Sequence, residues 1–240
     1  MIIGGLEKLS LLDFPERLSA VIFTQGCNFR CHFCYNPMLV WPSGIEGTDR
    51  SNKKGSPLIS EESLFAFLKE RQGKLEGVVI TGGEPTLHHD LPEFIEKIRQ
   101  LGYAVKLDTN GTNPEMVKKL AEKGLLDYIA MDLKGPLGKY GQVTGVNLDF
   151  NKIQKSVKII MESGIPYEFR TTVVPGLLDV GDISKMGEII RGADKWFLQK
   201  FKSEGELVDK KFIGQRAFTD KEMAQMEKIS AQYAKQTGVR

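Results

Sequence analysis

The sequence has little cysteine and little histidine, and it lacks both long apolar runs and an excess of charge of one sign. It contains three cysteines and three histidines among 240 residues. Three clustered thiols do not make a disulfide framework. With 33 basic and 31 acidic residues the net charge is +2, so charge alone predicts neither nucleic acid nor an anionic membrane as a partner.

The absence of a long apolar run also bears on location. No stretch approaches the length that a membrane span needs. Near the N-terminus, Glu7, Lys8 and Asp13 interrupt any apolar core of a signal peptide. Apolar residues make up 41% and charged residues 27%, which is typical of a soluble globular protein. We therefore predict a cytoplasmic protein with no membrane partner.

Six short runs of apolar and β-branched residues predict strands that are buried on both faces. They lie at residues 19–24, 77–81, 103–108, 126–132, 167–174 and 195–201. Helical patterns lie between them, and both Ser60 and the pair Asn113–Pro114 are typical helix starts. This alternation predicts an α/β fold of parallel strands with outer helices. Six strands fit either a partial, open (β/α)6 TIM-like barrel or a doubly wound sheet.

We predict a single domain over residues 1–240, because no linker divides the chain. Its core is expected at about 17–201, followed by a helical extension at about 202–240, where Thr219 and Glu222 form a capping-box pattern. The long polar stretch Ile45–Pro57 predicts a loop.

The polar and glycine-rich motifs gather at the C-terminal ends of the predicted strands. TGGEP (residues 81–85), DTNG (residues 108–111) and MDLK (residues 131–134) each end or follow a strand. Folds of the α/β class place their active sites at these ends. The positions therefore predict one site to which several strands contribute.

All three cysteines lie in the stretch TQGCNFRCHFCYNP (residues 24–37), with the spacing C-x3-C-x2-C. So compact a loop can direct three sulfurs at one metal centre, and soft thiolates suit zinc, Cu(I) or an iron–sulfur cluster. A four-cysteine ferredoxin-type cluster is excluded because the chain has no fourth cysteine. A [4Fe-4S] cluster with three protein ligands and one open iron remains.

Zinc stays open as an alternative. A structural zinc site normally takes a fourth protein ligand. His32 is adjacent to Cys31 in the sequence, which makes joint ligation of one ion awkward. His88 and His89, which follow the second predicted strand, could approach the cysteines in space.

The cysteine spacing, the aromatic Phe33 before the last cysteine, and TGGEP after the second strand together resemble the radical S-adenosylmethionine (SAM) superfamily. The resemblance implies a partial (β/α)6 barrel, a [4Fe-4S] cluster held by Cys27, Cys31 and Cys34, and SAM bound to the open iron. Further motifs resemble one subfamily, the activating proteins of anaerobic ribonucleoside-triphosphate reductase, which are relatives of pyruvate formate-lyase activating enzyme. They span roughly residues 4–201 and read GGLEKLSLLDFP, TQGCNFRCHFCYNP, GGEPTL, KLDTNGT, YIAMDLKGP, YEFRTTVVP and LQKF.

The resemblance also implies roles for individual residues. The expected SAM-binding residues are Phe33 and Tyr35 near adenine, Val174 at adenine through its backbone, Gly82, Gly83 and Glu84 along the methionyl group, Arg170 at the carboxylate, and Lys134 at the cofactor or the incoming peptide. A carboxylate at position 84 can hydrogen-bond an ammonium or brace the turn. A monovalent cation beside the SAM carboxylate would be held by Asp108, Thr109, Asp132 and the carbonyl of Ala130, since oxygen donors suit hard cations.

One departure from the relatives concerns the region after the sixth predicted strand. Pyruvate formate-lyase activating enzyme has a histidine there that contacts SAM, whereas this chain reads FLQKFKSEG. Gln199, Lys200 or Lys202 would have to substitute for it. This departure favours the reductase activator over the lyase activator.

The resemblance implies an enzyme, a radical SAM oxidoreductase of the glycyl-radical enzyme activating type. A reduced cluster would cleave SAM to methionine and a 5′-deoxyadenosyl radical, which would take a hydrogen atom from a glycine of a partner enzyme. The implied partner is anaerobic ribonucleotide reductase, with a flavodoxin or ferredoxin-like electron donor. The alternatives are a pyruvate formate-lyase-type activase, a radical SAM enzyme acting on a small molecule, and a non-enzymatic zinc or electron-transfer module.

Overall fold

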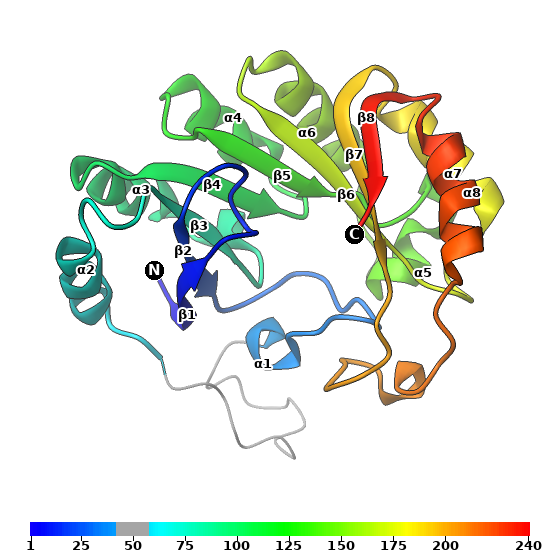
Figure 1. Cartoon of the computed structure of the whole chain (residues 1–240), viewed down its shortest axis with the longest axis horizontal. Helices are drawn as coiled ribbons and strands as arrows, with labels where there is room; N and C mark the ends of the chain where they lie inside the picture. Colours follow the sequence, from blue (N-terminus) through cyan, green and yellow to red (C-terminus); the bar gives the residue numbers. More distant parts are fainter. Residues whose placement is uncertain (42–57) are drawn as a thin grey trace. The chain divides into compact units, whose positions relative to one another are not determined.

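The structure is a computed structural model, and it describes residues 1–41 and 58–240 (Figure 1). The loop predicted at Ile45–Pro57 lies outside the described residues. The chain forms two compact units, each with its own core. The first consists of residues 1–28, 38–109 and 115–129, and the second of residues 29–37, 110–114 and 130–240.

The first unit is built on the strands β1 (Ile3–Ser10), β2 (Ser19–Thr24), β3 (Gly77–Gly82) and β4 (Ala104–Thr109). β1 pairs antiparallel with β2, whereas β2 with β3 and β3 with β4 form parallel pairs. The helices in this part of the sequence are α1 (Pro37–Val40), α2 (Glu61–Glu70), η1 (Pro85–Leu87), α3 (Leu91–Gln100) and α4 (Pro114–Glu122). Parallel strands that alternate with helices agree with the pattern of the sequence.

Apolar burial fixes the strands of the first unit. β2 and β3 are buried on both faces along most of their length, as their near-continuous apolar sequences predict. One buried cluster consists of Phe14, Val21, Val79 and Tyr128, with Phe23 and Ala104 packed against it. α2 begins at the predicted N-cap Ser60, whose hydroxyl accepts a hydrogen bond from the Ser63 amide at 3.1 Å.

The second unit contains the strands β6 (Tyr167–Val173), β7 (Ala193–Lys200) and β8 (Ala234–Val239), which form parallel pairs in that order. Its helices are η2 (Leu137–Lys139), α5 (Tyr140–Thr144), α6 (Phe150–Glu162), α7 (Val180–Ile189), η3 (Lys210–Phe212) and α8 (Asp220–Ser230). Among the described residues of the chain, no helix has both the length and the apolar character that crossing a membrane requires.

A buried tryptophan joins the strands of the second unit. Trp196 in β7 is fully buried, and its indole N–H donates to the Thr171 hydroxyl of β6 at 3.0 Å. A buried indole N–H needs such a partner. α8 begins with the predicted capping box of Thr219 and Glu222, and it packs against α7 and β8 (Figure 1).

The strand β5 (Tyr128–Asp132) contributes to both units, Tyr128 and Ile129 to the first and residues 130–132 to the second. The strands of the sheet follow the order of the chain from β1 to β8. The predicted α/β fold is confirmed, and β2 to β7 are the six predicted strands.

Two strands have no counterpart among the predicted ones. β1 carries the exposed residues Glu7 and Lys8, and β8 reads AKQTGV with no fully buried residue. Edge strands often carry polar residues on exposed positions, so they lack the apolar signal of the inner strands. β8 lies in the extension that the sequence predicts as helical, which instead combines α8 with a strand. The prediction of a single domain stays a prediction.

Candidate functional site

In the first unit, the predicted site residues stand at the ends of neighbouring strands. Gly82 is the last residue of β3, Thr109 is the last residue of β4, and Cys27 follows the end of β2. The parallel pairing of these three strands brings their C-terminal ends to one edge of the sheet. Glycine backbone, hydroxyl and thiol groups are thereby gathered at that edge.

Gly83 approaches the start of the cysteine loop very closely. Its N–H donates to the Thr24 carbonyl at 2.8 Å, and the Glu84 N–H donates to the Gly26 carbonyl at 2.8 Å. A Cβ atom on residue 83 would stand 2.1 Å from the Gly26 carbonyl oxygen, which is a severe clash. Only glycine, which has no Cβ atom, fits at this position. The TGGEP turn and residues 24–26 therefore form one hydrogen-bonded assembly.

Glu84 braces this assembly from inside. The residue is 1% exposed, and its Oε1 accepts hydrogen bonds from the Thr86 amide at 3.1 Å and from the Thr109 hydroxyl at 2.7 Å. The Thr86 hydroxyl donates to the same oxygen. A buried carboxylate needs donors of this kind. Of the two roles that the sequence leaves open for Glu84, these contacts are those of a brace.

A buried lysine neutralises Asp108. Lys106 Nζ lies 2.6 Å from Asp108 Oδ1, and the side chains are 2% and 10% exposed. The ammonium also lies over the Tyr128 ring, 6.0 Å from its centroid. Lys106 is not among the predicted site residues, although a lysine two positions before Asp108 in an apolar strand places both on one face. The monovalent-cation site at Asp108 and Thr109 stays a prediction.

Two of the three histidines use one ring nitrogen in protein contacts. His88 Nε2 lies 3.1 Å from the Gln25 carbonyl oxygen in the first unit. Burial lowers the pKa of His88 below its usual value. In the second unit, His32 Nδ1 lies 3.2 Å from Asp209 Oδ2. A histidine needs only one ring nitrogen to bind a metal, so these contacts leave the zinc alternative open.

In the second unit, Cys31 and Cys34 lie on one turn. The Cys34 N–H donates to the Cys31 carbonyl at 3.0 Å. Just before the turn, the Arg30 N–H donates to the Thr144 carbonyl at 2.8 Å, at the end of α5. Gly145 closes that helix with a φ of 69°, and a Cβ there would meet the Arg30 carbonyl oxygen at 2.6 Å. The end of α5 therefore fixes the entry to the cysteine turn.

Asp132, the last residue of β5, is held between two cations. Its Oδ1 lies 3.0 Å from Arg170 Nε, and its Oδ2 lies 3.0 Å from Lys134 Nζ. Burial opposes ionisation of Asp132, but the charges of Arg170 and Lys134 outweigh it and hold the pKa of the carboxyl at about 2, below its usual 3.8. The three side chains together carry one net positive charge at neutral pH.

Lys134 connects this group to the cysteine turn. Its ammonium lies over the Phe33 ring, 5.7 Å from the centroid. Burial opposes the charge of Lys134, but Asp132 together with the negative charge available on Cys31 and Cys34 raises its pKa above the usual value. Burial raises the pKa of Cys34, and the Lys134 ammonium partly offsets that rise. The Lys134 side chain is 15% exposed, and a largely enclosed ammonium near two thiols can balance the charge of metal-bound thiolates.

Tyr35 and Val174 each make protein contacts in the second unit. The Tyr35 hydroxyl accepts a hydrogen bond from the Lys202 N–H at 2.8 Å, and its ring stacks on Phe201 with centroids 6.3 Å apart. The Val174 carbonyl accepts from the Leu177 and Leu178 amides at 3.1 and 2.9 Å. The roles predicted for Tyr35 and Val174 at adenine stay predictions.

The three candidates for the missing histidine differ in their surroundings. Lys200 Nζ pairs with Asp220 at 2.6 Å, and the Lys202 side chain is exposed. Gln199 Oε1 accepts a hydrogen bond from the Thr172 hydroxyl of β6 at 3.4 Å. Gln199 is therefore the candidate that is oriented by a neighbouring strand.

Tyr140 supports Lys134 and is absent from the predicted site. Its hydroxyl accepts a hydrogen bond from the Lys134 N–H at 3.4 Å, and its ring makes edge contacts with Phe29 and Phe150. Burial raises the pKa of Tyr140, so the phenol stays neutral. A single tyrosine in the polar stretch GKYGQ carries no sequence signal for such a role.

The chemistry of the donor set suits a thiolate-bound cluster. Cys31 and Cys34 share one turn, the Lys134 ammonium lies over the Phe33 ring between them, and soft thiolates are ligands for iron–sulfur centres. Cys27 belongs to the first unit, and the other two belong to the second. Within residues 1–41 and 58–240, no three His, Cys, Asp or Glu side chains are gathered as a metal-binding group. A cluster held by all three cysteines therefore stays a prediction.

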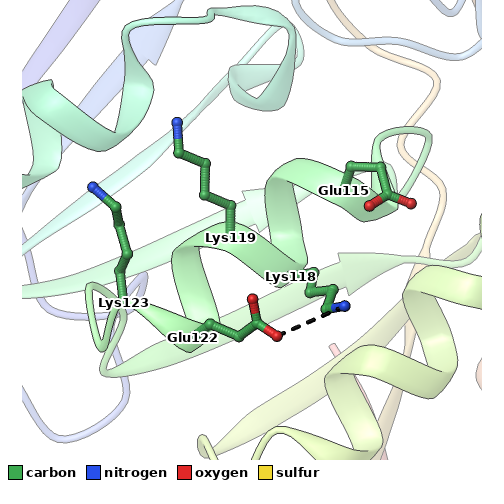
Figure 2. A pocket seen from close by; sticks show the side chains of 5 residues that line it. All are labelled: Glu115, Lys118, Lys119, Glu122 and Lys123. Carbon is green, nitrogen blue, oxygen red and sulfur yellow. Dashed lines mark ion pairs between the residues drawn. The ribbon is translucent and has the colours of Figure 1, made fainter.

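A pocket on the first unit is separate from these residues. Figure 2 shows that charged side chains of α4 and the following residue line it, namely Glu115, Lys118, Lys119, Glu122 and Lys123. A dashed line in the figure joins Lys118 and Glu122, whose Nζ and Oε1 atoms are 3.7 Å apart. Both side chains are more than half exposed, so this ion pair contributes little to stability. We interpret this pocket as the solvated face of a helix.

Gly83→Ala tests the close approach of the TGGEP turn. The new methyl group would overlap the Gly26 carbonyl, so we expect the free energy of unfolding to fall by about 1–3 kcal/mol. Urea denaturation measures this change. Gly138→Ala is the matched control, because a Cβ on residue 138 meets no atom within 4 Å. Equal stability of the two variants would contradict the close approach.

Asp132→Asn tests the carboxylate between two cations. A carboxyl whose pKa falls from 3.8 to about 2 on folding stabilises the protein above pH 4, and this contribution is lost as the pH falls towards 2. Wild type should therefore lose roughly 2 kcal/mol more than the variant between pH 4 and pH 2. Urea unfolding across this range measures the difference, with Asp194→Asn, a carboxylate of the same unit, as the control. Parallel profiles for wild type and Asp132→Asn would contradict the assignment.

Comparison with known proteins identifies the family. Residues 21–183 match the model of the Radical SAM superfamily. A Methanocaldococcus jannaschii protein, provisionally named as a glycyl-radical enzyme activating enzyme, is 30% identical over 239 residues, which cover 97% of this chain and 92% of that protein. The pyruvate formate-lyase-activating enzyme of Streptococcus mutans is 28% identical over 200 residues, which cover 79% of this chain and 72% of that enzyme. A solved domain of pyruvate-formate lyase-activating enzyme from Bacteroides vulgatus shares the fold, with a TM-score of 0.56 and 21% identity over 69% of this chain and 99% of that domain. This chain therefore belongs to the radical SAM superfamily.

Proposed function

We propose that this protein is a glycyl-radical enzyme activating enzyme and that its partner is an anaerobic ribonucleoside-triphosphate reductase. The observation that carries the proposal is the Lys134 ammonium, which is 15% exposed and lies over the ring of Phe33, the residue before Cys34, because a largely enclosed cation suits thiolates that hold a metal cluster. Similarity over nearly the whole chain to a protein provisionally named as an activating enzyme supports the same reaction class.

In this proposal, Cys27, Cys31 and Cys34 hold a [4Fe-4S] cluster and leave one iron open for SAM. When bound, the cluster and SAM supply one-electron chemistry that removes a hydrogen atom from carbon. Lys134 balances the charge of the thiolates, and Asp132 keeps the ammonium in place. A flavodoxin or ferredoxin-like protein would deliver the electron, and the cytoplasmic location stays part of the proposal.

The first unit would bind the methionyl part of SAM. Gly82 and Gly83 would contact SAM through their backbone, and they are glycines because the turn packs too closely on residues 24–26 to carry side chains. Glu84 would brace this turn through Thr86 and Thr109 rather than bind the ammonium, because its carboxylate already accepts their hydrogen bonds.

The second unit would bind the charged and aromatic ends of SAM. Arg170 is oriented through its Nε by Asp132, and a guanidinium is well suited to pair with a carboxylate. Phe33 and Tyr35 would lie near adenine, together with the backbone of Val174. Aromatic faces beside the cysteine turn would also exclude water from the reacting atoms.

The monovalent cation is the least supported part of the cofactor set. Asp108, Thr109 and Asp132 would hold it through oxygen atoms. Two of these residues already have cationic partners, Lys106 for Asp108 and both Lys134 and Arg170 for Asp132. These ammonium and guanidinium groups would supply part of the counter-charge of the site.

A pyruvate formate-lyase is the second candidate partner. The identity of 28% with the activating enzyme of Streptococcus mutans favours it. The missing histidine after β7 counts against it, since this chain has Gln199 and Lys200 in that region. The chemistry of the cluster would be the same for both partners.

The first experiment tests the cluster. The protein is purified and reconstituted anaerobically with iron and sulfide, reduced with dithionite, and measured by electron paramagnetic resonance with and without SAM. We expect a [4Fe-4S]⁺ signal that changes when SAM is added. Cys31→Ala should lose the signal and keep its circular dichroism spectrum, because the thiol lies on a turn outside the strands. Ser203→Ala, in the same unit, is the control. Bound zinc without iron would contradict the proposal.

The second experiment tests the partner. The reduced protein and SAM are mixed with an anaerobic ribonucleotide reductase or with a pyruvate formate-lyase, and a glycyl radical is sought by electron paramagnetic resonance. We expect a radical on the reductase that is absent when the reductase carries alanine at its radical glycine. A radical on the lyase alone would reassign the partner. Methionine formation with no protein radical would favour a small-molecule substrate.

A further inference from the structure

Within the second unit, the chain that follows β7 returns to the cysteine turn. We call residues 202–213 the post-β7 segment. The Val208 N–H donates to the Cys34 carbonyl at 3.3 Å, and the Asp209 N–H donates to the His32 carbonyl at 3.0 Å. Two consecutive amides of this segment therefore bond to the backbone of the turn that carries two cysteines.

The side chain of His32 strengthens this attachment. Its Nδ1 lies 3.2 Å from Asp209 Oδ2, and its ring stacks on Phe212 with centroids 5.6 Å apart and planes inclined by 16°. Asp209 also accepts a hydrogen bond from the Lys211 amide at 3.0 Å, which caps η3. Asp209 thus positions both His32 and the short helix that carries Phe212.

A second attachment lies at Tyr35, the residue after Cys34. The Lys202 N–H, at the start of the segment, donates to the Tyr35 hydroxyl at 2.8 Å. The Tyr35 ring stacks on Phe201, which is 1% exposed at the end of β7. Between the two attachments, Leu207 is buried and anchors the segment. Each cysteine of the turn is therefore followed by a residue that the C-terminal part of the chain holds.

We propose that the post-β7 segment is a clamp that holds the cysteine turn closed and thereby sets how long the cluster stays bound. His32, Asp209 and Phe212 are positioning residues that touch no reacting atom. A thiolate leaves a metal only when its backbone or side chain moves away, and groups around the ligands restrict that motion. This proposal rests on the proposed function in requiring a cluster at Cys31 and Cys34.

The test measures the rate at which a ferrous chelator removes iron from the reconstituted full-length protein under nitrogen. Phe212→Ala removes the stacked ring, and we expect iron release to become about two- to ten-fold faster. Asp209→Asn keeps the cap of η3 but loses the charge that faces His32, and we expect an increase of about two- to five-fold. Phe212→Tyr should restore the rate of wild type, because it restores the stacked ring.

Two matched controls lie in the same segment. Ile213→Ala removes an apolar side chain that is 46% exposed, and Glu206→Gln neutralises an exposed carboxylate. Both should release iron at the rate of wild type. Urea unfolding of every variant shows whether a faster release reflects global loss of stability. The clamp is overturned if Phe212→Ala and Asp209→Asn release iron no faster than these controls.

A readout without the cluster separates this proposal from the proposed function. In the cluster-free full-length protein, amide hydrogen exchange of residues 31–35 should become several-fold faster in Phe212→Ala than in Ile213→Ala. If wild type binds no cluster, the proposed function fails, and this exchange still decides whether the segment holds the turn. Unchanged exchange would by itself also overturn the clamp, and it would leave the SAM chemistry untouched.

Discussion

One carboxylate held between two cations organises the candidate site of the second unit. Asp132 ends β5 and bonds to Lys134 on one oxygen and to Arg170 on the other. Loss of this carboxylate would leave two poorly hydrated cations without a counter-charge, which is costly. Because Asp132 holds both, the ammonium can face the thiols and the guanidinium is kept in a fixed direction. The strand end becomes a pre-organised place for anions, and thiolates and the carboxylate of an amino acid are both anions.

In the first unit, close packing of the backbone fixes the geometry of the candidate site, whereas ion pairs do so in the second unit. Gly83 lies so close to Gly26 that no side chain fits between them, and Glu84 satisfies the hydroxyls around it. The result is a turn that exposes main chain and hides its carboxylate. In both units the acidic residues near the motifs have protein partners, so their role is to fix the geometry around the site as much as to contact a ligand.

Much of the fold is predictable from the sequence, because β2 to β7 are buried and therefore apolar. The edge strands β1 and β8 are not predictable in this way, because three residues of each are exposed and β8 has no buried residue. The cysteine loop and TGGEP are contiguous motifs and are visible in the sequence. The pairing of Lys106 with Asp108 is local and follows from the alternation of side chains along β4. The roles of Tyr140 and His32 depend on contacts between segments that are far apart in the sequence, and single-sequence patterns do not record such contacts. Glu84 could either bind an ammonium group or brace the turn. Which role it takes depends on the groups that surround its carboxylate, and the fold determines those groups.

The post-β7 segment also affects when the site can be completed. The ribosome makes the cysteine turn long before it makes Val208, Asp209 and Phe212. At roughly 5–20 residues per second, the turn waits on the order of ten seconds for its partners to emerge. During that interval its thiols lie on an unsupported loop. On the proposed function, a cluster that arrived before residues 208–212 were made would meet a cysteine turn that lacks its clamp.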